Sequence, residues 1–429
     1  MTGRRGSVWH GDRRVGTLRE DNHHTLRFAY DPQWLDQGGF PISIRLPVSS
    51  EDREVDAHGF FAGLLPEGGV RQRICRRRKI DPADDAALLF AIGEDCAGAL
   101  SVLPGEAAPD IKAKPPVPLT PEDVDRLIHS RGAEPVITGE QQRFSLAGVQ
   151  EKQPVIFDGR SYALPDRMNP SSHILKFETL PRVCFAEFVA GDMARRIGLP
   201  VVDTEFLRAD GPEAMPYLRI LRYDRAPDAN GRLRRLHQED LLQAFGMPGL
   251  LKYQADGGPS IRDVAQVLRD HTARPIDALE RLRDWQIFNY LVGNWDGHAR
   301  NLALLYEPDQ PVPVLAPFYD LVAIEFFNLI RPGDWARDMA LFIGRHRVPE
   351  KITKEDWEAF ASDLGMPPKR LLARLEQLAN ELPGAARRAR QAFAEHYGDE
   401  PVYDYLEESV RRRCHWTLSS GFTGAGKAS

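Results

Sequence analysis

The sequence reads NWDGHARN at residues 294–301 and FYD at residues 318–320. These segments place Asp296, Asn301 and Asp320 in the order and spacing in which phosphoryl-transfer enzymes carry a catalytic aspartate and two magnesium ligands. Mg²⁺ is a hard cation that prefers carboxylate, amide and water oxygens, so these residue types suit the chemistry. The pattern therefore predicts phosphoryl transfer. The alternative is an ordinary loop, because Asp, Gly and Asn are common turn residues.

Length and composition indicate a soluble protein of more than one domain. A chain of 429 residues exceeds what one hydrophobic core usually supports, and its hydrophobic (42%) and charged (28%) fractions are those of globular proteins. Sixty-two acidic and 56 basic residues give a formal net charge of -6, which disfavours broad contact with nucleic acid by this chain alone. No segment approaches the ~18 consecutive apolar residues of a spanning helix. With no apolar signal region near the N-terminus either, we expect a cytoplasmic protein that does not bind membranes.

The first quarter of the chain predicts an N-terminal α+β subdomain over residues 1–103. Its β-like runs cover residues 25–30 and 42–46, and its helical stretch covers residues 70–78. A proline-rich segment follows and predicts a connector over residues 104–120. Thr120 then caps a helix that begins with Pro121 and two acidic residues.

Residues 121–225 alternate strand-like runs with one strong helix, which is typical of a small lobe that covers a nucleotide. The runs cover residues 154–157 and 173–177, and the helix covers residues 183–197 before the stop signals Gly198 and Pro200. Lys176 lies on the second strand and Glu187 lies near the start of the helix. A strand lysine followed by a helix glutamate is the pair with which kinases hold the α- and β-phosphates. Each residue alone is equally consistent with an exposed surface charge.

The remainder of the chain predicts a helix-rich C-terminal lobe over residues 226–418, with the catalytic and metal-binding loops inside it. A helix over residues 276–292 leads directly into the loop at 294–301. Residues 419–429 are small and polar, which predicts a flexible tail. The expected fold class is α+β, a two-lobed protein-kinase-like fold with an N-terminal α+β subdomain.

Further ordered segments extend the pattern along nearly the whole chain. They are FFAGLLPE at 60–67, SLAGVQEK at 145–152, HILK at 173–176, QED at 238–240, KY at 252–253 with DGGP at 256–259, DGHARN at 296–301 and PFYD at 317–320. Together they resemble the HipA-type serine/threonine-protein kinases, the toxin halves of bacterial type II toxin-antitoxin pairs. The resemblance implies a kinase that uses ATP and Mg²⁺ to phosphorylate a serine or threonine of a protein.

Carried over residue by residue, the resemblance implies a role for each matching position. Asp296 would be the catalytic base, with Asn301 and Asp320 as magnesium ligands. Lys176 would bind phosphate, with Glu187 as its ion-pair partner. The implied nucleotide contacts are His298 in the catalytic loop, Leu221 and Tyr223 at the hinge, Asp224 at the ribose, and Ala147, Gly148, Val149, Gln150, Glu151 and Lys152 in the phosphate-binding loop.

Ser145 matches the loop serine that members of this family autophosphorylate, which implies self-inhibition. A phosphate there would add negative charge beside the triphosphate site, so repulsion and loop reordering are physically reasonable. The alternative is that its hydroxyl caps a turn. Two departures are visible. Leu221 stands where the type member has an acidic residue, and Arg300 replaces a catalytic-loop lysine, but neither change removes a chemically required group.

The resemblance also implies partners. It points to a HipB-type DNA-binding antitoxin, to operator DNA bound mainly through that antitoxin, and to a protein substrate for which an aminoacyl-tRNA synthetase is the candidate. Basic runs at residues 76–79 and 411–413 are more typical of solvated faces than of nucleic-acid contacts. Two other functions stay open. One is a small-molecule phosphotransferase of the aminoglycoside type, and the other is a nucleotide-binding co-repressor without kinase activity.

Overall fold

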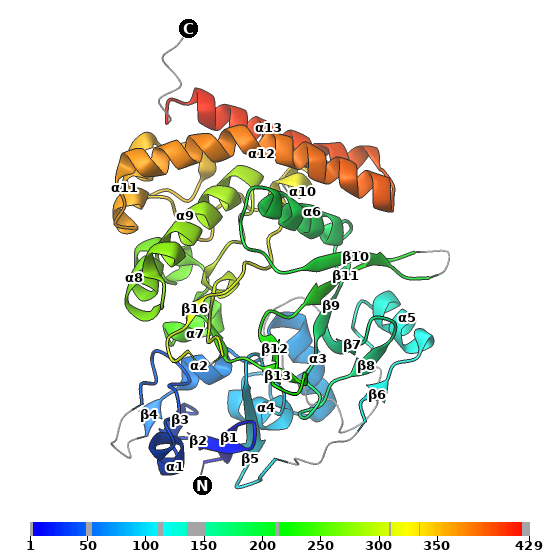
Figure 1. Cartoon of the computed structure of the whole chain (residues 1–429), viewed down its shortest axis with the longest axis vertical. Coiled ribbons are helices and arrows are strands. Elements are labelled where there is room, and N and C mark those ends of the chain that lie inside the picture. Colours follow the sequence, from blue (N-terminus) through cyan, green and yellow to red (C-terminus); the bar gives the residue numbers. More distant parts are fainter. Residues whose placement is uncertain are drawn as a thin grey trace. The chain divides into compact units, whose positions relative to one another are not determined.

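The computed structural model describes residues 3–48, 54–109, 115–134, 152–210, 214–308, 310–333 and 335–422 (Figure 1). The chain divides into two compact units. The first contains Met1–Leu180, Glu205–Leu250 and Ala303–Pro313, and the second contains Pro181–Thr204, Leu251–Leu302 and Val314–Ser429. None of the helices in the described ranges is long and apolar enough to cross a membrane.

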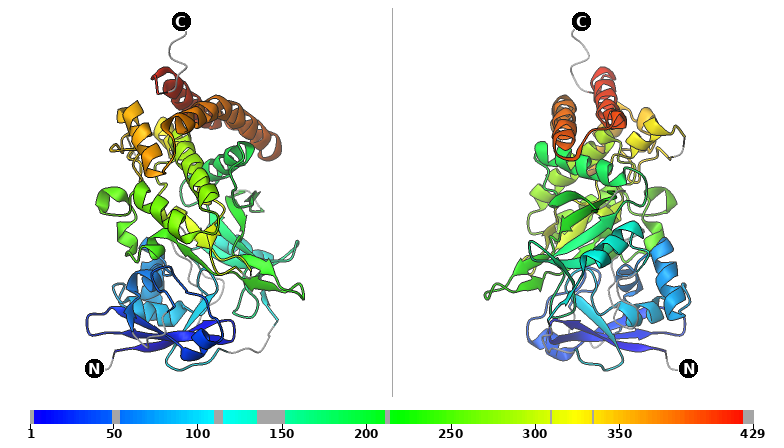
Figure 2. Two further views of the ribbon diagram at one scale, coloured as in Figure 1. Left: turned by 60° about the vertical axis from the view of Figure 1, so that its left-hand side comes forward. Right: turned by 90° about the vertical axis from the view of Figure 1, so that its right-hand side faces the viewer.

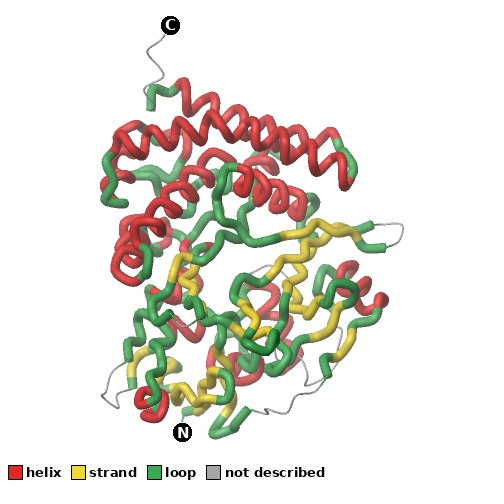
Figure 3. Tube along the Cα trace, viewed as in Figure 1, coloured by secondary structure: helices red, strands yellow, loops and turns green. Residues whose placement is uncertain are grey.

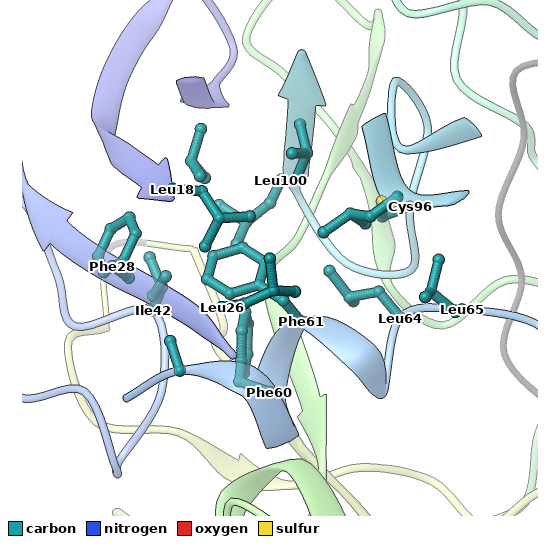
Figure 4. Close-up of a cluster of buried hydrophobic side chains, with 14 of the residues drawn as sticks. Leu18, Leu26, Phe28, Ile42, Phe60, Phe61, Leu64, Leu65, Cys96 and Leu100 are labelled. Carbon is teal, nitrogen blue, oxygen red and sulfur yellow. The ribbon is translucent and has the colours of Figure 1, made fainter. Parts of the chain in front are cut away.

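The first unit begins with a five-stranded antiparallel sheet in the order β4-β3-β2-β1-β5. These strands are β1 (Arg5–His10), β2 (Arg13–Glu20), β3 (Leu26–Tyr30), β4 (Val55–Asp56) and β5 (Leu100–Pro104). The helices of this region are α1 (Pro32–Asp36), α2 (His58–Ala62), α3 (Gly68–Arg78) and α4 (Asp85–Ile92). Buried side chains of the sheet and of α2, including Phe28, Phe60 and Phe61, share one core (Figure 4).

One predicted strand of this region is wrong. Residues 42–46 form a turn, in which the Leu46 amide donates to the Ser43 carbonyl across 3.0 Å. Ile42 and Leu46 are nevertheless buried. The alternation of apolar residues correctly indicated which side chains face the core, but a turn whose ends both enter the core produces the same alternation.

A second sheet in the first unit has the order β10-β11-β9-β7-β8-β6. Its strands are β6 (Val117–Pro118), β7 (Lys152–Phe157), β8 (Tyr162–Leu164), β9 (His173–Phe177), β10 (Thr204–Arg208) and β11 (Pro216–Leu221). The predicted helix start at Thr120 is confirmed, since Thr120 and Asp123 form a capping box at the start of α5 (Pro121–His129). The remaining elements are the hairpin β12 (Arg225–Pro227) and β13 (Leu233–Arg235), the paired strands β14 (Gln238–Asp240) and β15 (Ala303–Leu305), α7 (Leu241–Ala244) and η1 (Gly249–Leu251).

The second unit is mostly helical (Figure 3). Its elements are α6 (Val183–Arg196), η2 (Gln254–Asp256), α8 (Ile261–His271), α9 (Pro275–Val292), η3 (Ala299–Asn301), β16 (Val314–Leu315), α10 (Ile324–Ile330), η4 (Pro349–Lys351), α11 (Lys354–Asp363), α12 (Pro368–Tyr397), η5 (Pro401–Tyr403) and α13 (Asp404–Ser419). The long helix α12 packs against α13, α6, α11 and α9, and α12 and α13 lie side by side in every view (Figure 1 and Figure 2).

The compact units differ from the expected domain boundaries. The expected small lobe, residues 121–225, is divided between them, because α6 packs against α12 in the second unit while β10 and β11 join the sheet of the first. Sequence order does not reveal this division, because a helix and the strands beside it can pack against different partners.

The core of the first unit can be tested at Phe61, which is fully buried. We expect Phe61→Ala to lower the free energy of unfolding by ~3–5 kcal/mol, because it removes a ring from a closely packed core. Chemical denaturation monitored by circular dichroism would measure the change. As a control, Leu250→Ala should cost less than ~0.5 kcal/mol, since the Leu250 side chain is 88% exposed. Equal losses in the two variants would contradict this core.

Candidate functional site

The loop at residues 294–301 follows directly from the end of α9. Gly293 ends that helix in the left-handed conformation, with φ of 73°. A side chain there would also collide with Glu325, whose Cβ lies 2.4 Å from the position a Cβ would take. Every residue of the loop is buried except Asp296. The turn therefore presents a single carboxylate on a buried loop.

Contacts on both sides of Asp296 hold this loop in place. The Trp295 indole donates a hydrogen bond of 3.2 Å to Glu325, and Glu325 is in turn paired with Arg337. The Trp295 carbonyl accepts from the Ala340 amide at 2.9 Å. On the other side, a Cβ at Gly297 would lie 2.5 Å from the Asn289 side-chain nitrogen, so only glycine fits there.

Tyr253, from the KY segment, contacts the exposed carboxylate. Its hydroxyl donates to Asp296 Oδ1 across 2.7 Å. Burial, followed by the negative charge of Asp296, raises the pKa of Tyr253 above its ordinary value. The phenol therefore stays protonated at neutral pH and acts as a donor. One oxygen of Asp296 is thereby oriented, and Oδ2 is left to face a reactant.

The second loop brings Asp320 to Asn301. The Asn301 Nδ2 lies 3.3 Å from Asp320 Oδ2, and Tyr319 donates to the Arg300 carbonyl at 2.7 Å. Asp320 has φ of 59°, a conformation that costs a non-glycine residue ~1 kcal/mol or more and that clusters at functional sites. Two of the predicted ligands are thus in direct contact, although 19 positions separate them.

The oxygen donors at this point fit a magnesium ion that arrives with a nucleotide. Asn301 Oδ1 accepts one hydrogen bond, from the His298 amide at 3.1 Å, and keeps a second lone pair. Within the described ranges no cluster of three or more His, Cys, Asp and Glu residues could hold a metal by itself. Mg²⁺ does not need one, because phosphate oxygens and water usually complete its octahedron.

His298 contributes an unsatisfied polar atom. Burial lowers its pKa to about 4, against the opposing charges of Asp296 and Asp320, so the imidazole is neutral at pH 7. Its Nδ1 is buried and has no hydrogen-bond partner in the described part of the chain. A buried polar atom without a partner is costly, which makes a bound ligand its natural partner.

Lys176 and Glu187 are both buried, at 2% and 7% exposure. Lys176 lies on β9 in the first unit, in register with Lys152 on β7. Glu187 lies on α6 in the second unit. Because the two residues belong to different units, their ion pair stays a prediction. Residues 145–151 lie outside the described residues, so the assignments of Ser145, Ala147, Gly148, Val149, Gln150 and Glu151 also stay predictions.

The hinge region departs from expectation at Asp224. Leu221 ends β11 and is 43% exposed, and the Tyr223 hydroxyl donates to Gln238. The carboxylate of Asp224, however, is buried between Arg222, at 2.6 Å, and Arg225, at 3.0 Å. This geometry supports a structural role for Asp224 rather than the expected contact with ribose. Sequence reasoning missed the pairing because adjacent opposite charges usually lie on the surface.

Tyr253, Trp295 and Glu325 are site residues to which the sequence analysis assigned no role. Tyr253 precedes its partner Asp296 by 43 positions, and Glu325 follows Trp295 by 30. No spacing rule connects positions so far apart. The one available signal was the presence of the KY dipeptide among the ordered segments.

Comparison with protein families agrees with this geometry. A model described as "HipA-like C-terminal domain" matches residues 144–386, and one described as "HipA N-terminal domain" matches residues 6–103. The chain belongs to the HipA family. Among its HipA relatives is "Putative kinase Y4mE" of Sinorhizobium fredii (strain NGR234), 34% identical over 423 residues that cover 96% of this chain and 98% of that protein.

A second relative and a solved structure come from Shewanella oneidensis. Its "Serine/threonine-protein kinase toxin HipA" is 28% identical over 390 residues, which cover 87% of each chain. In the solved complex of Shewanella HipA, HipB and operator DNA, the matching chain has a TM-score of 0.82 at 23% identity, with 99% of this chain and 100% of that chain covered. At that identity the likeness shows the fold. The expected α+β, kinase-like fold class and the HipA resemblance are therefore confirmed.

The role of Asp224 can be tested through stability. Although burial alone would raise it, the Arg222 and Arg225 guanidinium groups hold the pKa of Asp224 well below its usual range. We expect Asp224→Asn to lower the free energy of unfolding at pH 7 by ~3 kcal/mol, because it leaves two guanidinium groups without their counter-charge. A depressed pKa contributes stability above the unfolded-state pKa of about 4, so the loss should shrink as the pH falls below that value.

Urea denaturation at several pH values would measure this loss of stability. The ATP affinity of the same variant would be measured in a separate binding titration. Asp36→Asn, at an exposed position, is the matched control. If Asp224→Asn left stability unchanged and abolished nucleotide binding, the result would support the contact of Asp224 with ribose and contradict a purely structural role.

Proposed function

We propose that this chain is a serine/threonine-protein kinase that uses ATP and Mg²⁺ and acts as the toxin of a toxin-antitoxin pair. The observation that carries the proposal is the arrangement of Asp296, Asn301 and Asp320 on two contacting loops of the second unit. Membership of the HipA family and the kinase names of its relatives support the same reaction. They favour it over an aminoglycoside-type phosphotransferase.

In this proposal Asp296 orients the hydroxyl of a substrate serine or threonine and accepts its proton. The hydroxyl oxygen bonds to the γ-phosphorus while the bond from that phosphorus to the departing ADP oxygen breaks. Tyr253 keeps the Asp296 carboxylate in one orientation through Oδ1. An acceptor with one free oxygen and a fixed direction suits proton removal and does not suit a co-repressor that only binds nucleotide.

The remaining assignments concern ATP. Asn301 and Asp320 would hold Mg²⁺, which when bound neutralises charge on the phosphates. Lys176, supported by Glu187, would bind the α- and β-phosphates, and a buried ammonium needs such an anionic partner. The neutral imidazole of His298 would meet the nucleotide through Nδ1. The backbone at Leu221 and Tyr223 would hold adenine.

Partners follow from the relatives. Shewanella oneidensis HipA is solved together with HipB and its operator DNA. By analogy we propose a HipB-type antitoxin for this chain, with operator DNA bound mainly through it. The resemblance alone makes an aminoacyl-tRNA synthetase the candidate substrate, and Ser145 the candidate site of inhibitory autophosphorylation.

The reaction is tested by Asp296→Asn. We expect the rate of γ-phosphate transfer from ATP to fall by a factor of ~10²–10⁴, because the general base is lost while its shape remains. ATP affinity should stay nearly unchanged, since in this proposal Asp296 acts on the substrate hydroxyl and holds neither ATP nor Mg²⁺. Labelled ATP, incubated with the chain alone and with a bacterial extract, would measure transfer. Asp36→Asn should transfer at the normal rate, and an Asp296→Asn variant as active as the parent would refute the assignment.

Self-modification is tested by mass spectrometry of the phosphate-free chain after incubation with Mg-ATP. We expect an increment of one phosphoryl group, mapped to Ser145, that Asp296→Asn lacks. Ser145→Ala should also lack the increment and should keep transferring phosphate to other proteins, because its catalytic loops are intact. An active chain that gains no phosphate at Ser145 would exclude this form of regulation.

A further inference from the structure

The first unit contains a cavity of about 820 Å³ that the proposed kinase chemistry does not use. It is lined by parts of β1, β5 and β13, whose positions are labelled in Figure 1, together with loop residues near 40, 167 and 306. All of these lining segments belong to the first unit. Among the described residues, none of those assigned to ATP or magnesium lines it. Its size is that of a small-molecule site.

The charge in the cavity is mainly that of arginine. Arg235 is neutralised by Asp95 at 2.7 Å, and both side chains are nearly buried. Arg167 is less well paired. Its Nη2 donates to the Gly11 carbonyl, and its Nη1 is buried without a hydrogen-bond partner in the described part of the chain. Burial accordingly lowers the pKa of Arg167 to about 10, which leaves it charged at pH 7. Arg234 adds a third, exposed guanidinium group.

Two acidic residues, Asp12 and Glu307, also line the cavity. Asp12 is exposed, and its charge therefore interacts with its neighbours through water. Three arginines line the cavity beside these two acids. Burial, and then the charges of Arg13 and Arg235, lower the pKa of His10 to about 4, so its imidazole is neutral at pH 7. An anion therefore meets more cationic than anionic side chains along the lining.

His237 supplies a hydrogen-bond acceptor. It is 3% exposed, and its Nε2 donates to the Ile42 carbonyl at 2.7 Å. Burial lowers its pKa to about 4, so the ring is neutral and its Nδ1 carries a lone pair. That Nδ1 is buried without a partner among the described residues. A donor on a bound molecule would satisfy it.

Aromatic rings form a further part of the lining. Phe40 lies with its ring centre 5.4 Å from that of His237 and 5.7 Å from that of Tyr306, and the last two are 5.2 Å apart. Rings at these separations offer faces and edges to a flat group. The cavity thus combines the partly buried Arg167, whose Nη1 has no hydrogen-bond partner among the described residues, with an aromatic wall.

We propose that this cavity binds a small phosphate monoester with an aromatic body. Arg167 and Arg234 receive the phosphate, because guanidinium groups pair with phosphate oxygens through charge-assisted hydrogen bonds. The ring lies against Phe40 and Tyr306. A ligand that also carries an N–H or O–H group on its ring would donate to His237 Nδ1. A dianionic phosphate gains more than a carboxylate from the guanidinium groups that line the cavity.

Phenyl phosphate is the probe, titrated calorimetrically into the full chain, with inorganic phosphate and benzoate as separate arms. We expect saturable binding of phenyl phosphate, at least ~10-fold tighter than either comparison anion, because inorganic phosphate lacks the ring and benzoate replaces the dianionic phosphate with a singly charged carboxylate. Arg167→Gln and Arg234→Gln should each weaken it by ~10-fold or more, through loss of a charged hydrogen bond. Arg76→Gln, at an exposed arginine of α3, removes the same charge elsewhere and should leave binding unchanged.

Arg234→Gln protects the test from a folding defect, because the Arg234 side chain is exposed. Thermal unfolding without ligand should give the same midpoint for that variant and the parent. The proposal is overturned if phenyl phosphate does not saturate at millimolar concentration, or if its affinity survives both cavity substitutions. Benzoate binding as tightly as phenyl phosphate would also overturn it, since the cavity would then recognise carboxylates.

Discussion

The position of the catalytic loop depends on one buried carboxylate. Glu325 is 9% exposed and accepts hydrogen bonds from Trp295, Asn328 and Arg337. A buried carboxylate is tolerated only when such partners replace water, and here the partners come from different segments of the chain. Arg413 on α13 then stacks over the Trp295 ring, with its guanidinium carbon 5.4 Å from the ring centre. Helices distant in sequence thereby set the direction of Asp296.

Buried polar atoms that lack a protein partner point to places where a ligand could bind, because burial without a partner is costly. Within the described residues, His298 Nδ1 is unsatisfied beside the proposed ligands of magnesium in the second unit. In the first unit, His237 Nδ1 and Arg167 Nη1 are unsatisfied around one cavity. Native proteins pair nearly all buried polar atoms, so exceptions deserve a reason. At both places a bound phosphate compound would supply the missing hydrogen-bond partners. The two sites differ in charge. The loops that carry Asp296 and Asp320 are acidic, whereas arginines line the cavity of the first unit.

Much of the secondary structure could be predicted from local pattern. The helix after Thr120 begins where its cap predicted, and α9 ends at a glycine that adopts φ of 73°. The prediction of a strand at residues 42–46 was wrong, because a buried turn and a strand show the same alternation of apolar and polar residues. The pairing of Asp224 was not foreseen, because the burial of Arg222 and Arg225 depends on the strands around them, which no short pattern reports.

The sequence by itself determined the chemistry that the site could perform. The order and spacing of Asp296, Asn301 and Asp320 are local, and the family resemblance rests on ordered segments of the same kind. Tertiary structure alone decided that Asn301 meets Asp320, that Tyr253 orients the Asp296 carboxylate, and that a cavity lined by arginines exists in the first unit. The physical reason is separation along the chain. Capping and periodicity act between near neighbours, whereas burial and pairing are set by residues that meet only when the chain has folded.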